Sequence, residues 1–135
     1  MQPVISVTSK SRYAVVALAE LARSGEGPVP IAAVAERREI PVQFLEQLFA
    51  TLRRAGILDS RRGVKGGYTL ARPAEQIEVL EVVQVLDGRL GEEGKEAGGS
   101  WEEGVEALRA VFSGTTIADI AAREASQAGA ATYHI

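Results

Sequence analysis

The sequence contains no cysteine among its 135 residues. This absence excludes disulfide bonds, cysteine nucleophiles and every site that needs thiolate ligands for zinc or an iron–sulfur cluster. The one histidine, His134, lies in the C-terminal tail, and no metal-ligand spacing occurs. The GVKGGY string resembles a phosphate-binding loop, but it lies in an expected hairpin and not before a helix N-terminus. We therefore expect no enzymatic activity and no cofactor.

The sequence also lacks a long apolar run. No stretch approaches the roughly 20 residues that a helix needs to cross a membrane. The first 21 residues do not match a secretory signal, because Lys10, Arg12 and Glu20 interrupt their apolar stretch. The sequence thus favours a cytoplasmic protein without a membrane partner.

The net charge of −3 conceals an uneven distribution along the chain. Residues 1–72 contain 11 Lys and Arg against 6 Asp and Glu, which gives +5. Residues 73–135 contain 4 against 12, which gives −8. A basic half followed by an acidic half is typical of a nucleic-acid-binding module attached to an acidic partner module, with random surface variation as the alternative.

Three helices followed by a hairpin are expected in the basic half. Apolar residues recur at helical spacing in Ser9–Ser24, Ile31–Arg38 and Val42–Ala55. Two short strands are expected at Ile57-Leu58 and Gly67–Leu70, with a glycine-rich loop between them. Helices joined by a tight turn and followed by a two-stranded wing form a winged helix-turn-helix. The expected fold class is therefore mainly α with a small β-hairpin wing.

Three further helical patterns occur in the acidic half. They cover Ile77–Leu86, Trp101–Phe112, and a short final helix that Thr115 or Thr116 caps and that ends near Gln127. Residues 87–100 are rich in glycine and glutamate and predict a mobile loop, and the last eight residues are expected to be frayed. The middle helix carries a narrow stripe of coiled-coil spacing, formed by Trp101, Val105, Leu108 and Phe112.

The third expected helix presents a polar face opposite its apolar face. Gln43, Glu46 and Gln47 lie on its N-terminal half, where a helix in the major groove contacts base edges. Glutamine pairs with adenine, and glutamate accepts a hydrogen bond from cytosine. These residues are candidate base readers; for Glu46 the alternative is a solvated charge or an intrahelical partner of Arg53 or Arg54.

Five basic residues accompany that polar face. Arg53 and Arg54, at the end of the helix, are candidate phosphate contacts, which position a protein on DNA without specifying sequence. Arg61, Arg62 and Lys65 lie in the wing loop, where a narrow hairpin can reach the minor groove. The alternative for the wing is an ordinary solvated hairpin.

Three strings in the first 88 residues resemble one family of bacterial regulators. They are ISVTSKSRYAVVALAELA, IAAVAERREIPVQFLEQLFATLRRAGILDSRRGVKGGYTLARP and IEVLEVVQVLDG. They closely resemble the Rrf2 family of winged helix-turn-helix transcriptional regulators, and weaker similarity continues through TTIADIA. In that family a glutamate matching Glu46 contacts a base, and an arginine matching Arg62 enters the minor groove.

The resemblance implies a homodimer whose two winged domains bind a near-palindromic operator in double-stranded DNA. Long helices cross between the subunits in that family, which assigns the stripe on residues 101–112 to dimerisation. Many members hold an iron–sulfur cluster with three cysteines before the long helix, and this chain has none. It therefore resembles the cluster-free branch, whose members respond to a small-molecule or protein effector.

The predicted organisation is a DNA-binding domain at residues 1–87, a loop at 88–100, and dimerisation helices with a tail at 101–135. The predicted function is sequence-specific regulation of transcription, as a repressor. The alternative is a winged-helix protein-interaction module that does not bind DNA. Trp101 is interpreted as the apolar anchor of its helix, with part of an effector pocket as the alternative.

Overall fold

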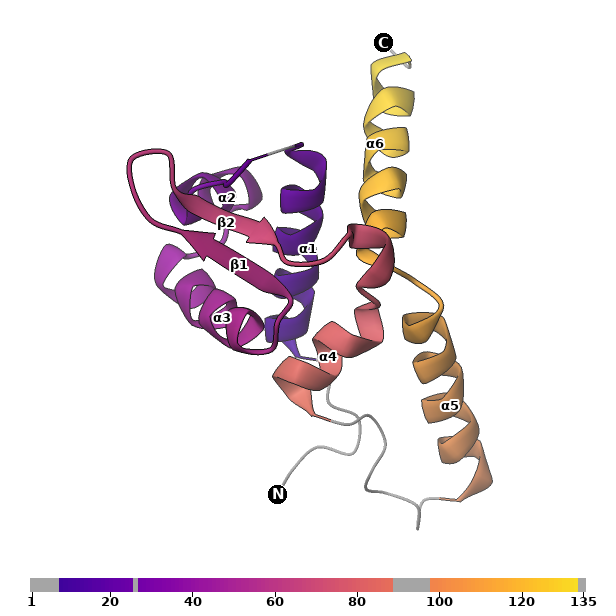
Figure 1. The fold of residues 1–135 in the computed structure, drawn as a ribbon. Helices are drawn as coiled ribbons and strands as arrows, with labels where there is room; N and C mark the ends of the chain where they lie inside the picture. The colour runs from indigo at the N-terminus through magenta and orange to yellow at the C-terminus, as the bar shows by residue number, and fades with distance from the viewer. Residues whose placement is uncertain (1–7, 26, 89–97, 134–135) are drawn as a thin grey trace.

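The computed structural model describes residues 8–25, 27–88 and 98–133 (Figure 1). These residues form six α-helices and one antiparallel two-stranded hairpin, which confirms the mainly α prediction. The elements in chain order are α1 (Ser9–Arg23), α2 (Ile31–Arg38), α3 (Val42–Arg54), β1 (Leu58–Arg61), β2 (Gly67–Leu70), a 3-10 turn (Ala74–Gln76), α4 (Val79–Asp87), α5 (Gly99–Ser113) and α6 (Ile117–Tyr133). Most of the loop predicted at 87–100 lies outside the described residues.

Helix α1 begins where α4 ends. The hydroxyl of Thr8 caps α1 by accepting a hydrogen bond from the backbone N–H of Lys10 at 3.2 Å. The carboxylate of Asp87 accepts hydrogen bonds from the Thr8 backbone at 2.9 Å, from the Thr8 hydroxyl at 2.6 Å, and from the buried Ser11 hydroxyl. A negative charge is favourable at this end of the α1 dipole. The contact fixes the two helices to each other.

A tight turn sets the angle between α2 and α3. Glu39 ends α2 in the left-handed backbone region, with φ of 55°. The N–H of Ile40 donates to the carbonyl of Ala35 at 2.9 Å, which closes the end of α2. Pro41 is the N-cap, with ψ of 128° outside the helical region, and α3 begins at the next residue, Val42. The Ile40-Pro41 pair therefore marks the helix boundary that its sequence predicts.

The main core lies between the first three helices and the hairpin. In α3 the fully buried residues include Phe49, whose ring meets that of Tyr68 in β2 at 4.9 Å between centroids and 65° between planes. Phe44 is only half-buried and meets Tyr13 of α1 edge-on at 5.6 Å. Phe49, at i+4 from Leu45 on the buried face of α3, thus joins α3 to the wing. The other fully or nearly fully buried residues of α3 are Leu45, Leu48 and Leu52.

Strand β1 lies later than predicted. The strand covers Leu58–Arg61 and pairs with β2 from Leu58 opposite Leu70 to Arg61 opposite Gly67. Ile57 precedes it, is fully buried, and accepts a hydrogen bond from the N–H of Ala71 at 2.9 Å. The prediction at Ile57-Leu58 was wrong because most of the strand is polar, as a two-stranded ribbon exposed to solvent permits.

The start of α4 also differs from the prediction. The helix begins at Val79 and not at Ile77, because the preceding residues pair with the start of α6. The carbonyl of Ile77 accepts from the N–H of Ile117 at 2.9 Å, and Val79 donates to the carbonyl of Thr115 at 2.9 Å. Ile117 itself is fully buried in the main core with residues of α1–α3. The C-terminal helices are therefore joined to the first half of the chain through its core.

Helix α6 is longer than the short final helix predicted. Thr116 and Asp119 exchange reciprocal hydrogen bonds of 2.9 and 3.1 Å at its start, which forms a capping box. The helix then continues to Tyr133, so the predicted end near Gln127 and the frayed tail were wrong over this range. Alanine is frequent in this segment and has the highest helix propensity, which outweighs the single Gly129. His134 lies outside the described residues.

The stripe on α5 faces α4 of the same chain. Val105 is buried, and Leu108 and Phe112 pack against the small apolar cluster around Val83. Trp101, at the start of the stripe, keeps 36% of its surface exposed. Much of the stripe is thus occupied by contacts inside the protomer, while Val111 on another face of α5 is 62% exposed.

Candidate nucleic-acid interface

The base-reading candidates lie together on the outer side of α3. Gln43, Glu46 and Gln47 are all exposed in the first two turns, on the face opposite the buried leucines. No side chain caps the N-terminus of α3, because Pro41 precedes it. The first N–H groups of α3 are consequently available, and such groups favour a phosphate. This end of α3 can present donors to a backbone while its side chains contact bases.

The two arginines at the end of α3 are exposed beyond the reading face. Arg54 donates to the hydroxyl of Thr51 at 3.3 Å, one turn earlier on the helix. Arg53 and Arg54 occupy the last turn, where cations also complement the helix dipole. They thus lie at the opposite end of α3 from Gln43, and together these residues extend the polar surface along the whole helix.

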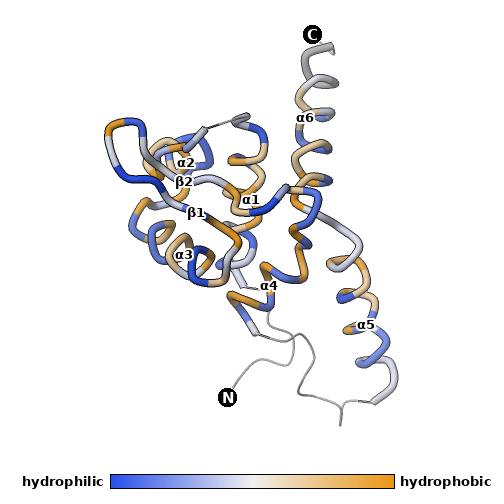
Figure 2. Tube along the Cα trace, in the orientation of Figure 1, coloured by the Kyte–Doolittle hydropathy of each residue, from blue (hydrophilic) through white to orange (hydrophobic). Residues whose placement is uncertain are grey.

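The wing loop presents the remaining cations. Arg61, Arg62 and Lys65 are exposed, and the N–H of Gly66 donates to the carbonyl of Gly63 at 3.0 Å to close the loop. Figure 2 shows the loop between β1 and β2 with hydrophilic segments on either side of a hydrophobic tip. Only glycine fits at position 66, because a side chain at Gly66 would overlap the backbone carbonyl of Arg61.

These cations have no acidic partner in the described ranges. The ion pairs found there do not involve Arg53, Arg54 or any of the three wing cations. Glu46 is also unpaired within those ranges, so the intrahelical ion pair considered for it does not occur there. Unpaired cations around one polar helix face produce a positive surface that a phosphate backbone can neutralise.

Two contacts hold the wing against the reading helix. Tyr68 of β2 packs on Phe49 of α3, as described above. Tyr68 also exchanges backbone hydrogen bonds of 2.8 and 3.0 Å with Val29, in the segment before α2. The wing is thereby attached to both helices of the helix-turn-helix. The position of Phe49 at i+4 from Leu45, on the apolar face of α3, was the only sequence signal for this contact.

Val64 was missed by the sequence analysis. It lies in the wing loop between the basic residues Arg62 and Lys65 and is fully exposed, at 104% of the reference area. An apolar side chain at the end of a basic hairpin is able to contact sugar edges or wedge between bases in a minor groove. Its signal in the sequence is an isolated valine among charged residues and glycines.

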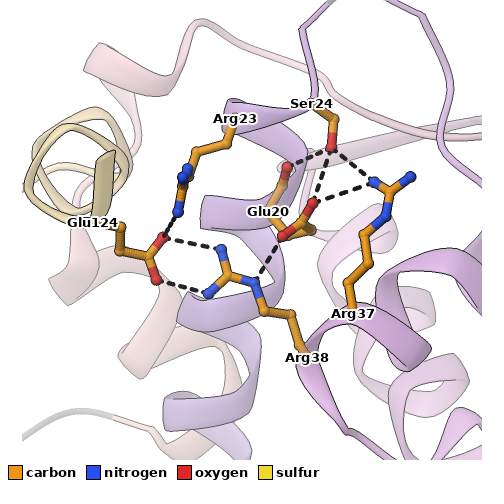
Figure 3. A network of polar contacts seen from close by, with 6 residues as sticks. All are labelled: Glu20, Arg23, Ser24, Arg37, Arg38 and Glu124. Carbon is orange, nitrogen blue, oxygen red and sulfur yellow. Dashed lines mark hydrogen bonds and ion pairs between the residues drawn. The ribbon is translucent and has the colours of Figure 1, made fainter. Parts of the chain in front are cut away.

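Arg38 ties the first helix of the helix-turn-helix to the C-terminal helix (Figure 3). Its Nε donates to Glu20 of α1 at 2.8 Å. Its two terminal nitrogens donate to the carboxylate of Glu124 of α6 at 2.7 and 2.9 Å, a bidentate pair. Arg37 reaches Glu20 at 3.2 Å and Arg23 reaches Glu124 at 3.8 Å. The network joins α1, α2 and α6.

The network also shifts the titration of its members. Hydrogen bonds from Arg38 lower the pKa of Glu124 below its ordinary value of 4.5, against the opposing effect of burial. Burial by itself would raise the pKa of Glu20, but hydrogen bonds from Arg38 and Arg37 outweigh it and lower the pKa. Both carboxylates therefore remain ionised, and the pair with Arg38 is retained, at neutral pH.

Neither a metal centre nor a membrane span is found in the described ranges. No cluster of His, Asp or Glu in residues 8–25, 27–88 and 98–133 could hold a metal ion. No helix in the same ranges combines the length and apolar character that crossing a bilayer requires. Because the whole sequence also lacks cysteine, its residues do not fit a thiolate-ligated iron–sulfur cluster.

Comparison with known proteins agrees with this geometry. The model of the Rrf2 family, described as "Iron-dependent Transcriptional regulator", matches residues 7–123. The HTH-type transcriptional regulator IscR of Cereibacter sphaeroides is 46% identical over 86 residues, which cover 62% of this chain and 56% of that protein. IscR of Xenorhabdus nematophila is 50% identical over 82 residues, which cover 60% of this chain and 50% of that protein. The matches thus span about half the length of these curated relatives.

Two solved structures resemble the whole fold. The global cysteine regulator CymR of B. subtilis has a TM-score of 0.79 at 31% identity and covers 88% of this chain and 98% of that one. T. potens IscR also has a TM-score of 0.79, at 38% identity, and covers 92% of this chain and 90% of that one. These relatives are regulators of transcription and not enzymes. With a family match over residues 7–123, this chain belongs to the Rrf2 family of winged helix-turn-helix transcriptional regulators.

Proposed function

We propose that this chain represses transcription by binding a near-palindromic operator as a homodimer, without an iron–sulfur cluster. The main support for the proposal is that the polar helix α3 and the basic wing are held in a fixed relative position. The exposed face of α3 and the unpaired cations of the wing are held together through Phe49 and Tyr68. A helix in the major groove and a hairpin in the adjacent minor groove need such a fixed separation.

Within this proposal, Gln43, Glu46 and Gln47 contact bases and Arg62 enters the minor groove. Arg53, Arg54, Arg61 and Lys65 contact phosphates, which fix the register on the duplex. All of these side chains are exposed. The exposed polar groups on the first turns of α3, with cations in its last turn and in the wing, support the division between reading and positioning.

The proposed dimer uses the C-terminal helices. Two identical reading heads must lie about one helical turn of DNA apart, near 34 Å. The α5 stripe of Trp101, Val105, Leu108 and Phe112 is the proposed seam, and its partly exposed end at Trp101 is the part available to a second protomer. Because the stripe also contacts α4, the dimer interface would then be connected directly to the domain that carries α3.

The absence of cysteine supports regulation without a cluster. Iron–sulfur clusters in regulators of this size need several thiolate ligands, and carboxylates do not replace all of them. A relative named IscR shares the reading half of the chain, but that half includes no cluster ligand here. The proposed input is a small molecule or a protein, with no redox change at a metal.

Selection of genomic fragments, followed by a salt titration, tests the function. We expect an enriched motif with two related half-sites. The logarithm of the binding constant should fall with the logarithm of the salt concentration with a slope of about −4 to −7, because about four to eight phosphates are contacted per dimer. Fluorescence anisotropy on the selected fragment measures the slope. Failure to enrich any motif would favour the alternative, an adaptor whose acidic half docks a basic protein.

Arg62→Ala should weaken binding to the selected operator by about 1–2 kcal/mol, or roughly tenfold. It should also relax preference at an AT-rich position, because the arginine is attracted by the potential of a narrow minor groove. Anisotropy with operators substituted at that position measures both effects. Arg109→Ala on α5 is the matched control and should leave affinity unchanged; equal affinities for the two variants would remove Arg62 from the interface.

A further inference from the structure

An apolar groove lies on the molecule away from the reading face. It has a volume of about 460 Å³ and is formed by α1, α4, the end of α5 and the start of α6. This volume lies within the range of small-molecule sites. Its apolar walls are contributed chiefly by Val15, Val16, Val79, Val83, Phe112 and Ile120.

The charged residues on the lining of this groove are both basic. They are Arg12 and Arg123, and no Asp or Glu lies on the lining. Arg123 forms no ion pair with another described residue. The guanidinium of Arg12 lies 4.5 Å from the centre of the Tyr13 ring, also without a described carboxylate partner.

An unpaired guanidinium beside an apolar wall favours one class of ligand. A carboxylate accepts two parallel hydrogen bonds from an arginine, and Arg12 and Arg123 are both exposed and so are accessible to a ligand. The rest of such a ligand must be apolar to gain from burial against the valines and Phe112. Thr115, also on the lining, supplies one hydroxyl that can orient the polar end.

We propose that this groove binds a small monocarboxylate with an apolar body, its carboxylate at Arg123 and its apolar part between α1 and α4. The site shares no residue with the proposed DNA-reading surface. Binding to the groove can therefore be measured without DNA, and its failure would leave the proposed operator binding untouched.

Calorimetric titration of the 135-residue chain with three matched probes tests the proposal. The probes are 3-phenylpropanoate, 3-phenylpropylamine and 3-phenylpropanol, which differ only in the polar end. We expect saturable binding of the carboxylate with a Kd between about 10 μM and 1 mM. The amine should bind at least tenfold more weakly, because it places a second cation beside Arg123.

Three variants locate the binding. Arg123→Gln should weaken the carboxylate at least tenfold, and Val16→Phe, which fills the groove from a half-buried position, should abolish binding. Arg109→Gln, on α5 outside the groove, should bind as wild type does. Thermal unfolding of each variant at equal concentration establishes that the fold is retained.

Three results would overturn the proposal. The first is equal binding of acid and amine, or no saturation by the acid up to about 10 mM. The second is a change of the monomer–dimer equilibrium in Arg123→Gln and Val16→Phe with no carboxylate binding to wild type, which would assign the groove to a second copy of the chain. Unchanged carboxylate affinity in Arg123→Gln would equally remove the ligand from this groove.

Discussion

Replacing Arg38 with methionine should lower the free energy of unfolding by about 2–3 kcal/mol at neutral pH. The substitution keeps most of the apolar stem but removes three hydrogen bonds. It leaves Glu20 with Arg37 at 3.2 Å and Glu124 with only the longer contact to Arg23 at 3.8 Å. The side chains of Glu20 and Glu124 are only 16% and 24% exposed, so water replaces the lost contacts incompletely. Urea denaturation at fixed protein concentration measures the loss.

The neighbouring arginine provides a matched control. Arg37 is 54% exposed and has a single ion pair with Glu20, so Arg37→Met should cost less than about 1 kcal/mol. Adding Glu124→Gln to Arg38→Met should restore part of the stability, because it removes a carboxylate that would keep only the longer contact to Arg23 at 3.8 Å. Equal losses in Arg37→Met and Arg38→Met would show that burial and bidentate geometry contribute nothing here.

The effect of Arg38 should depend on pH in a defined direction. The pKa values of Glu20 and Glu124 are lowered by folding, so their contribution is present above the unfolded value of 4.5 and is lost as pH falls through the folded values. The difference between wild type and Arg38→Met should therefore be constant from about pH 6 to 8 and should shrink below about pH 4.5. A difference that grows on acidification would contradict this account.

Gly67→Ala should destabilise the protein by about 3 kcal/mol or more and greatly weaken operator binding. Gly67 has φ of 150°, and a side chain there would overlap the backbone carbonyl of Val29. Relieving that overlap moves β2 away from Val29 and breaks the two hydrogen bonds that Tyr68 makes with it. The wing would then lose its position relative to α3.

Gly63→Ala is the control that separates the energetic cost of steric overlap from the cost of a backbone conformation with positive φ. Gly63 also has positive φ, 109°, but nothing lies within reach of an added side chain. We expect a cost of about 1 kcal/mol from the backbone alone and a fold that still binds the operator. Thermal unfolding and anisotropy on both variants make the comparison, and a Gly67→Ala protein as stable as Gly63→Ala would refute the proposed role of the Val29 contact.

Local signals predicted the elements that depend on local chemistry. The bounds of α2 were found because Ile40-Pro41 stops the helix, and the start of α6 was found because Thr116 is a good cap. Strand β1 was misplaced because its pairing depends on β2 and leaves its residues polar. The start of α4 was missed for a similar reason, since Ile77 is held by Ile117, 40 residues later in the chain.

The candidate interface likewise has one part that the sequence predicted and one part that it did not. The exposure of Gln43, Glu46 and Gln47 followed from helical periodicity alone. The contacts that position the interface were not accessible from the sequence, because Phe49 meets Tyr68 and Arg38 meets Glu124 only after the chain has folded. Arg38 and Glu124 are separated by 86 positions, and no periodicity relates such a pair.

The burial of Ile117 limits how this regulator can be recombined. A chimera that joined residues 1–87 to the sensing half of another regulator would keep the reading helix but lose the side chain that fills the space beside Ile77 and Val82. Its main core would then have an uncovered apolar seam, and the fragment would tend to associate or to be degraded. For this chain, the winged half and the C-terminal helices must be engineered as one unit, and a graft succeeds only when the donor supplies an equivalent of Ile117.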